Sequence, residues 1–461
     1  MGATAAIAEF IARTSIADFP PASTEKAKKA LADTFAVIVA GAGSEVAEPL
    51  HKYLAAAQAP GPIPILGTAM TAAPETAALV NGTFGHALDY DDVLSIMPAH
   101  PSAVIVAALL ASIHGKRVDG RAFIEAYLVG VEVGGNIGIG MTNGHYQRGF
   151  HATGTLALFS GLAALAKLHK LDVAAIQQAF GIASSMSSGL RRNFGTMTKP
   201  LHTGIAARSA LTAFNLAASG FSAAPDVLEA KAGFFSSYGV AESSVDITVK
   251  GLGKPYIIVD PGLALKKFPC CYASHRAIDG LLALRRKLAC DATNVAKVIC
   301  RMPPGGMHVL TYPRPVTGLE GKFSLHYPLA AALLDGKCAL ATFTDEYVQR
   351  KEIATLYERI DAAENPACRG DDPLFETRSS GSKGFVEVEI HLSNGKSETI
   401  RVDKAPGSPT RELAWNVLHE KFIDCAHHSQ HIGESRAGQA FDMIQKLDNI
   451  KDIAEVTRLL C

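Results

Sequence analysis

Long apolar segments rich in alanine, glycine and serine fill the chain up to about residue 265, and they restrict the fold more than any other feature of the sequence. Apolar residues recur in them at the three- and four-residue spacing of a helix surface. Small residues at these positions allow neighbouring helices to approach closely. The predicted helices are 3–14, 24–41, 75–95, 101–114, 120–140, 153–168, 172–189, 200–219 and 224–232. We therefore expect a mainly α fold with a large all-helical domain.

The pattern changes after about residue 265. Residues 295–302 have strand character, and residues 385–392 alternate strictly between apolar and polar side chains. An Asn-Gly turn then leads into residues 397–402, which predicts a β-hairpin. Further helices are predicted at 273–289, 326–336 and 345–360, and again from 408 to the C-terminus.

These patterns predict two domains. Both chain ends would form the helical domain, residues 1–265 and 407–461. Residues 266–406 would form a smaller inserted α+β domain that acts as a cap or lid.

Composition argues against several classes of function. The 44 Lys and Arg residues balance the 44 Asp and Glu residues, so neither nucleic acid nor an anionic membrane is favoured as a partner. The longest apolar runs, such as residues 103–113, are too short to span a bilayer, and the N-terminus lacks the pattern of a signal peptide. All eight cysteines follow residue 269 without metal-ligand spacing. We expect reduced thiols and a cytoplasmic location.

Ionisable side chains cluster in two glycine-rich segments that lie between predicted apolar helices. Their candidate residues are Tyr146, His151, Arg191, Arg192, Lys199 and His202. A residue before proline avoids helical backbone angles, and proline is favoured in the first helical turn. A helix is therefore predicted to start at Pro200, with Lys199 at its N-terminus, where free N–H groups attract carboxylate or phosphate. The alternative is an ordinary helix start with a solvated lysine and a core histidine.

Other segments supply further candidates. Asp89 and Asp92 lie one turn apart where a helix gives way to a loop, and carboxylates among apolar residues are costly unless they are paired or functional. His100 precedes Pro101 at a helix start, as Lys199 precedes Pro200. For the carboxylates the alternative is an acidic helix end that makes caps, and for His100 it is a structural histidine.

The predicted insert contributes three more candidates. Lys266 and His275 flank Pro269 at its start, and Tyr327 follows in the segment 323–328. Lys266 could offer positive charge and His275 a proton. For Tyr327, a core aromatic is the more common outcome.

Cofactor and nucleophile motifs are not recognisable. Glycine-dense residues 134–140 follow no predicted strand, so a dinucleotide site is not supported. His427, His428 and His431 could hold a metal, but a solvated helix face is the simpler interpretation. We expect acid–base chemistry on an anionic substrate without a metal or cofactor.

Five blocks together resemble the MmgE/PrpD family, from about residue 5 to the C-terminus. They are H-A-L-D-Y-D-D-V with A-H-P-S-A, G-F-H-A-T-G-T, G-T-M-T-K-P-L-H-T-G-I-A-A-R, L-K-K-F-P-C-C-Y-A-S-H-R-A-I-D and K-F-S-L-H-Y. The resemblance implies a helical domain built from both chain ends, an α+β lid, a homodimer, and metal-free catalysis between the domains. Known members are 2-methylcitrate dehydratase, cis-aconitate decarboxylase and iminodisuccinate epimerase.

Carried over by motif, the resemblance implies six catalytic residues: Asp89, His100, His151, Lys199, His275 and Tyr327. The candidates for substrate binding are Arg191, Arg192, His202, Lys266 and Tyr146. Val93 stands where the decarboxylase pattern D-F-D-D-T-W has its threonine, and the dehydratase N-D-T is here D-D-V.

The three activities share proton movement at a carbon next to a carboxylate. Because two of their sequence patterns are altered here, we expect an epimerase of an amino- or imino-dicarboxylate such as iminodisuccinate. The alternatives are a lyase like cis-aconitate decarboxylase or 2-methylcitrate dehydratase, and a non-catalytic module that binds an acidic metabolite.

Overall fold

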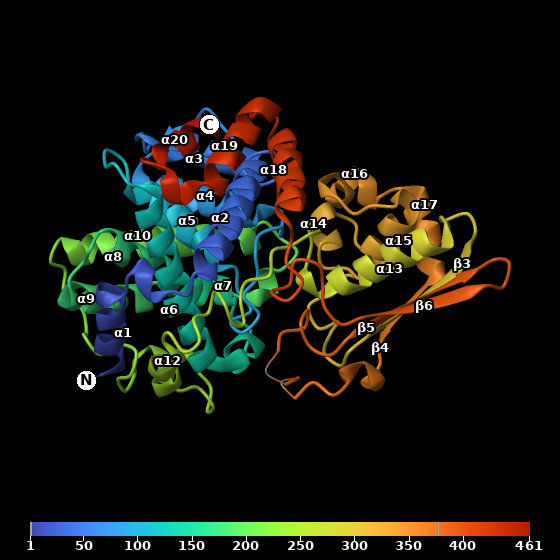
Figure 1. Cartoon of the computed structure of the whole chain (residues 1–461), viewed down its shortest axis with the longest axis horizontal. Coiled ribbons are helices and arrows are strands. Elements are labelled where there is room, and N and C mark those ends of the chain that lie inside the picture. The colour runs from blue at the N-terminus through green and yellow to red at the C-terminus, as the bar shows by residue number, and fades with distance from the viewer. Residues whose placement is uncertain (1, 374, 377) are drawn as a thin grey trace. The chain divides into compact units, whose positions relative to one another are not determined.

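The computed structural model describes residues 2–373, 375–376 and 378–461, and the chain divides into two units (Figure 1). The helical unit comprises Met1–Asn193, Met197–Ala264 and Ala414–Cys461. The sheet unit comprises Phe194–Thr196 and Leu265–Leu413. The protein is mainly α, with its larger sheet confined to the second unit, which confirms the predicted fold class.

Small side chains and helical spacing give the helical unit its architecture. Its main helices are α1 (Ala3–Arg13), α2 (Ala22–Gly41), α3 (Ala47–Ala57), α4 (Pro74–Ala87), α5 (Pro101–Ser112), α6 (Gly120–Gln147), α7 (Ala152–Thr155), α8 (Ala157–Leu168), α9 (Val173–Ser184), α10 (Thr198–Ala218), α11 (Phe234–Tyr238), α12 (Val245–Gly251), α18 (Trp415–Ser429), α19 (Glu434–Gln445) and α20 (Ala454–Leu459). Strands β1 (Ile63–Pro64) and β2 (Thr71–Ala72) form a short antiparallel pair.

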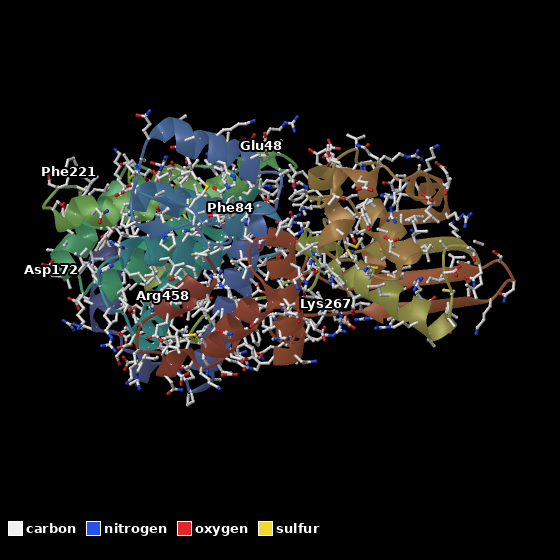
Figure 2. All side chains as sticks on the ribbon, turned by 90° about the horizontal axis from the view of Figure 1, so that it is seen from above. Glu48, Phe84, Asp172, Phe221, Lys267 and Arg458 are labelled. Carbon is white, nitrogen blue, oxygen red and sulfur yellow. The ribbon has the colours of Figure 1, made fainter. Side chains whose placement is uncertain are left out.

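Helix α5 is the centre of the helical unit. Its sequence is apolar on every side, and each residue from Pro101 to Ala111 is buried. Helices α4, α8 and α10 pack against it. Figure 2 shows the contrast between core and surface: Phe84 of α4 lies inside the unit, whereas Phe221, 59% exposed, lies at its edge.

Helix α6 has the length and apolar composition of a membrane span. However, 83% of its most apolar 18-residue window is buried within the protein. This burial is the pattern of a helix in a protein core.

The two ends of the chain meet in this unit. Helix α18 packs on α2, and the ammonium of Lys421 lies 2.6 Å from the carboxylate of Asp33. Lys421 also donates a 2.7 Å hydrogen bond to the carbonyl of Tyr90, just after α4. Helix α18 therefore holds the loop from which the site described below is built.

Several predictions of helices are wrong in the helical unit. Helix α4 ends at Ala87 rather than near residue 95, because Asp89 adopts a left-handed φ of 50°. Helix α10 begins at Thr198, so Pro200 lies within its first turn, where a missing N–H costs nothing. Residues 224–232 form turns instead of a helix, and the chain reverses at Ala232 with φ 62°.

The sheet unit combines helices with a four-stranded sheet of order β4-β3-β5-β6. Its strands are β3 (Val295–Met302), β4 (Ile360–Glu364), β5 (Val386–Leu392) and β6 (Ser397–Val402), and its longer helices are α13 (His275–Leu288) and α15 (His326–Asp335). Its short helices are α14 (Gly318–Gly321), α16 (Asp345–Val348) and α17 (Lys351–Leu356). The predicted hairpin is confirmed, with Val388 opposite Ile400.

One sequence prediction in this unit is wrong. The helix expected at 345–360 is two short helices, because Arg350 between them has a non-helical ψ of 136°. Its guanidinium binds Asp335 at 2.6 and 2.9 Å. The chain then enters β4, which pairs in parallel with β3, Ile360 lying opposite Val298.

Helices α4 and α10 touch through glycine. A Cβ added at Gly204 would lie 2.1 Å from the carbonyl oxygen of Leu79 and 2.3 Å from Oγ1 of Thr83. Because Lys199 and His202 lie on the same helix, this backbone contact fixes their position relative to the end of α4.

We expect Gly204→Ala to lower the free energy of unfolding by about 2 kcal/mol or more, because the helices must separate to admit the methyl group. The measurement is denaturant unfolding. Gly438→Ala in α19 is the matched control: its Cβ meets nothing within 4 Å, so it should stabilise the protein by about 0.5 kcal/mol. Equal stability of both variants would contradict the close contact.

Candidate active site

Three buried carboxylates follow helix α4 in the segment Asp89–Asp92. Burial of a carboxylate is costly without a partner, and each of these has a different one. The pairs are Asp89 with the ammonium of Lys199, Asp91 with His86 and Asp92 with the hydroxyl of Ser102. The acidic segment is therefore not a solvated helix end.

Asp91 lies between two histidines. Its Oδ1 is 2.9 Å from Nδ1 of His86 and 3.4 Å from Nδ1 of His100, the N-cap residue of α5. Burial alone would raise the pKa of Asp91, but the two histidines hold it well below the usual range. An ionised carboxylate at Nδ1 favours the tautomer with the proton on Nδ1 and the lone pair on Nε2.

His151 and His202 form a second pair. Nδ1 of His151, the N-cap residue of α7, lies 3.0 Å from Nδ1 of His202 in α10. Burial lowers the pKa of His202 to about 4 and that of His151 well below the ordinary value, and Lys199 adds to both shifts. Both rings are neutral near pH 7.

The four histidines stand in a row. The ring centroids of His100 and His86 are 4.3 Å apart, those of His86 and His151 5.7 Å, and those of His151 and His202 5.2 Å. Burial also lowers the pKa of His86, to about 3. His86, His151 and His202 are therefore neutral imidazoles near pH 7, which can accept or donate a proton.

Lys199 supplies the positive charge of the site. It lies in the first turn of α10, 4% exposed, and donates a hydrogen bond to Asp89. A buried lysine and carboxylate stabilise each other's charge. Positive charge beside neutral histidines suits an anionic substrate.

Arg191 and Tyr146 contact each other. Arg191 donates a 2.8 Å hydrogen bond to the carbonyl of Tyr146, and its guanidinium lies 4.0 Å from the centre of the tyrosine ring. Arg192 is exposed. Their predicted roles in substrate binding stay predictions.

The remaining candidates belong to the sheet unit. His275 is buried at the start of α13, with Nε2 3.2 Å from the carbonyl of Cys270. The hydroxyl of Tyr327 donates to the carbonyl of Thr342, and burial raises its pKa. Lys266 is fully buried. These contacts suit a core role for Tyr327, and the functional roles of all three stay predictions.

Comparison with known families covers almost the whole chain. Residues 5–243 match the MmgE/PrpD N-terminal domain, and residues 268–449 match the MmgE/PrpD C-terminal domain. The chain belongs to the MmgE/PrpD family.

Curated relatives of this MmgE/PrpD protein include cis-aconitate decarboxylases. The mouse enzyme is 26% identical over 94% of this chain and 88% of its own length. The enzyme of Aspergillus terreus is 26% identical over 100% of this chain and 96% of its own, and the human enzyme is 26% identical over 84% and 79%.

The MmgE/PrpD site contains residues that sequence reasoning missed. His86 was not selected, although it lies in the same block as Asp89, five residues before its partner Asp91. Ser102 was also missed; its hydroxyl binds Asp92 and lies 2.7 Å from the hydroxyl of Tyr127. A histidine one turn before an acidic loop is the signal that could have found His86.

One group of residues in the MmgE/PrpD site has the spacing of metal ligands. Ligand atoms of His86, Asp89 and His100 lie within 4.8 Å of one another. However, the ammonium of Lys199 is already bound to Asp89, and it would repel a divalent cation there. The donor set fits an organic anion better than a metal.

Asp92 should make stability depend on pH. Burial raises its pKa from 3.8 to about 8, although the hydrogen bond from Ser102 lowers it. The folded protein therefore keeps a proton that the unfolded chain releases near pH 4. When folding raises the pKa of an acid, its protonation stabilises the folded state fully at any pH below the pKa in the unfolded chain. This stabilisation is lost as the pH rises toward the pKa in the folded protein.

We therefore expect the melting temperature of Asp92→Asn, relative to that of the wild type, to rise between about pH 4 and 8, because the variant lacks this contribution. The measurement is the melting temperature of both proteins across that range. Asp226→Asn, at an exposed position, is the control and should leave the slope unchanged. Parallel curves for the wild type and Asp92→Asn would contradict a protonated Asp92.

Proposed function

We propose that this MmgE/PrpD enzyme moves a proton at the carbon next to a carboxylate of a small di- or tricarboxylate. The row of buried histidines beside the buried Lys199 supports it most. Such a carbon is a weak acid, so the reaction needs a base within hydrogen-bond reach and a positive group where negative charge develops.

The two requirements correspond to different side chains. His100 and His151 are the proposed proton-transfer groups, because each stands at a helix N-terminus with Nδ1 turned to a partner. Lys199 is the proposed stabiliser of the enolate-like charge. Asp89 would keep this lysine protonated, because an adjacent carboxylate favours the charged ammonium.

Decarboxylation of cis-aconitate is one candidate reaction. It is supported by three relatives named cis-aconitate decarboxylase that align over most of their length. Loss of carbon dioxide leaves a carbanion, which the histidine row could protonate beside Lys199.

Epimerisation of an amino- or imino-dicarboxylate, such as iminodisuccinate, is the second candidate. It is favoured by Val93, which lacks the hydroxyl of the decarboxylase pattern. Val93 is 8% exposed, and its backbone pairs with Ala264. An epimerase needs two proton-transfer groups at one carbon, and this site holds more than one neutral histidine.

Incubation in D₂O with each acid separates the candidates. Deuterium at the α-carbon with inversion supports epimerisation, released carbon dioxide supports decarboxylation, and a new double bond supports dehydration. The measurements are proton NMR with chiral analysis, and detection of carbon dioxide. Binding of these acids without any exchange or turnover would instead support a non-catalytic binder.

Lys199→Met should lower kcat/KM by at least about 100-fold, because one preorganised charge at a transition state contributes that much. It should also destabilise the fold by roughly 3 kcal/mol, since it leaves Asp89 buried without its cation. The double variant Asp89→Asn/Lys199→Met should regain stability but not activity. Lys250→Met, at an exposed position of α12, is the control for both measurements. Full turnover by a folded Lys199→Met protein would contradict this role.

A further inference from the structure

The pair His151–His202 joins two side chains through the same ring atom, Nδ1, at 3.0 Å. A neutral imidazole carries one proton, on either Nδ1 or Nε2. A hydrogen bond between two Nδ1 atoms therefore requires opposite tautomers. When His151 donates, its Nε2 carries a lone pair; when His202 donates, Nε2 of His151 carries the proton.

Glycine backbone encloses this pair. The N–H of His151 donates a 3.0 Å hydrogen bond to the carbonyl of Gly189, whose φ is 137°. A Cβ at Gly189 would lie 3.3 Å from Cγ of His202, and one at Gly154 would lie 2.3 Å from the carbonyl of Ser188. The backbone thus closes on the ring of His202 and holds it against His151.

The two rings differ in their ability to hold a proton. His151 is 1% exposed and lies near the positive or titratable groups Lys199, His86 and His100. His202 is 5% exposed, and the charged group acting on it is Lys199. Burial and Lys199 lower the pKa of His202 to about 4, whereas the pKa of His151 is lowered by burial, by Lys199 and by the neighbouring histidines. A proton that reaches His151 is therefore more stable on His202.

We propose that His202 is a positioning residue that sets the tautomer of His151 and receives, through the Nδ1–Nδ1 hydrogen bond, the Nδ1 proton of His151 when Nε2 of His151 takes a proton from the substrate. This role rests on the proposed function. It distinguishes His202 from the substrate-binding residue that the sequence suggested.

The proton count balances in each step. The C–H bond of the substrate breaks, its electron pair stays on carbon, and Nε2 of His151 takes the proton. His151 then passes its Nδ1 proton to Nδ1 of His202, which becomes the imidazolium. His151 is left neutral with its proton on Nε2, where it can return a proton to carbon. The Nδ1 proton returns from His202 to His151 as Nε2 gives its proton back to carbon, so His151 stays neutral and the pair is reset.

His202→Asn tests this role, because the asparagine amide can stand near the place of Nδ1 and bind His151 but cannot carry a proton. We expect kcat to fall about 100-fold with little change in KM. Imidazole should partly restore His202→Ala, to an extent that depends on the pKa of the added imidazole. His169→Asn, outside the histidine row, is the control and should keep kcat within about threefold.

Two results would overturn the role of His202. One is a His202→Asn enzyme with wild-type kcat, which would show that any hydrogen-bond partner suffices. The other comes from nitrogen NMR of the resting protein labelled at histidine: His151 and His202 should have opposite tautomers, and identical tautomers would contradict the pair. This second measurement needs no turnover, so it separates failure of the pair from failure of the proposed function, which wild-type exchange in D₂O tests.

Discussion

Burial of charge inside an apolar helical unit is the constraint on which the site depends. Each carboxylate of Asp89–Asp92 would be costly in this core without a partner. One carboxylate binds a lysine, one binds a histidine and one is protonated at neutral pH. Three neighbouring residues of one type therefore have three different electrostatic states, because their partners differ.

The partners come from elements that only close packing can bring together. His86 ends α4, His100 starts α5, His151 starts α7, and Lys199 and His202 lie in α10. Gly82 and Gly204 allow α4 and α10 to meet at backbone distance: a Cβ at Gly82 would lie 2.9 Å from Cα of Gly204. The small residues of the sequence therefore allow the close helix packing that brings the polar residues of the site together.

Much of the fold was predictable from the sequence because helical spacing and the Asn-Gly hairpin are local signals. The end of α4 was not predictable in this way, since Asp89 leaves the helix to reach Lys199, a contact distant in the chain. Strand β4 was missed because its pairing with β3 is non-local. Of the candidates chosen beside Pro101 and Pro200, His100 lies in the histidine row and Lys199 acts on it as a neighbouring charge, whereas His86 carries no helix-start signal of its own.

The balance between Lys199 and the histidines limits the chemistry of the site. Burial and, to a smaller extent, repulsion by this ammonium keep His86 and His151 neutral until a substrate brings negative charge. Binding of a polycarboxylate would offset part of that repulsion and raise the histidine pKa values toward neutrality. The substrate would then strengthen the histidine bases that act on it, which favours a polyanion over a neutral ligand of the same shape.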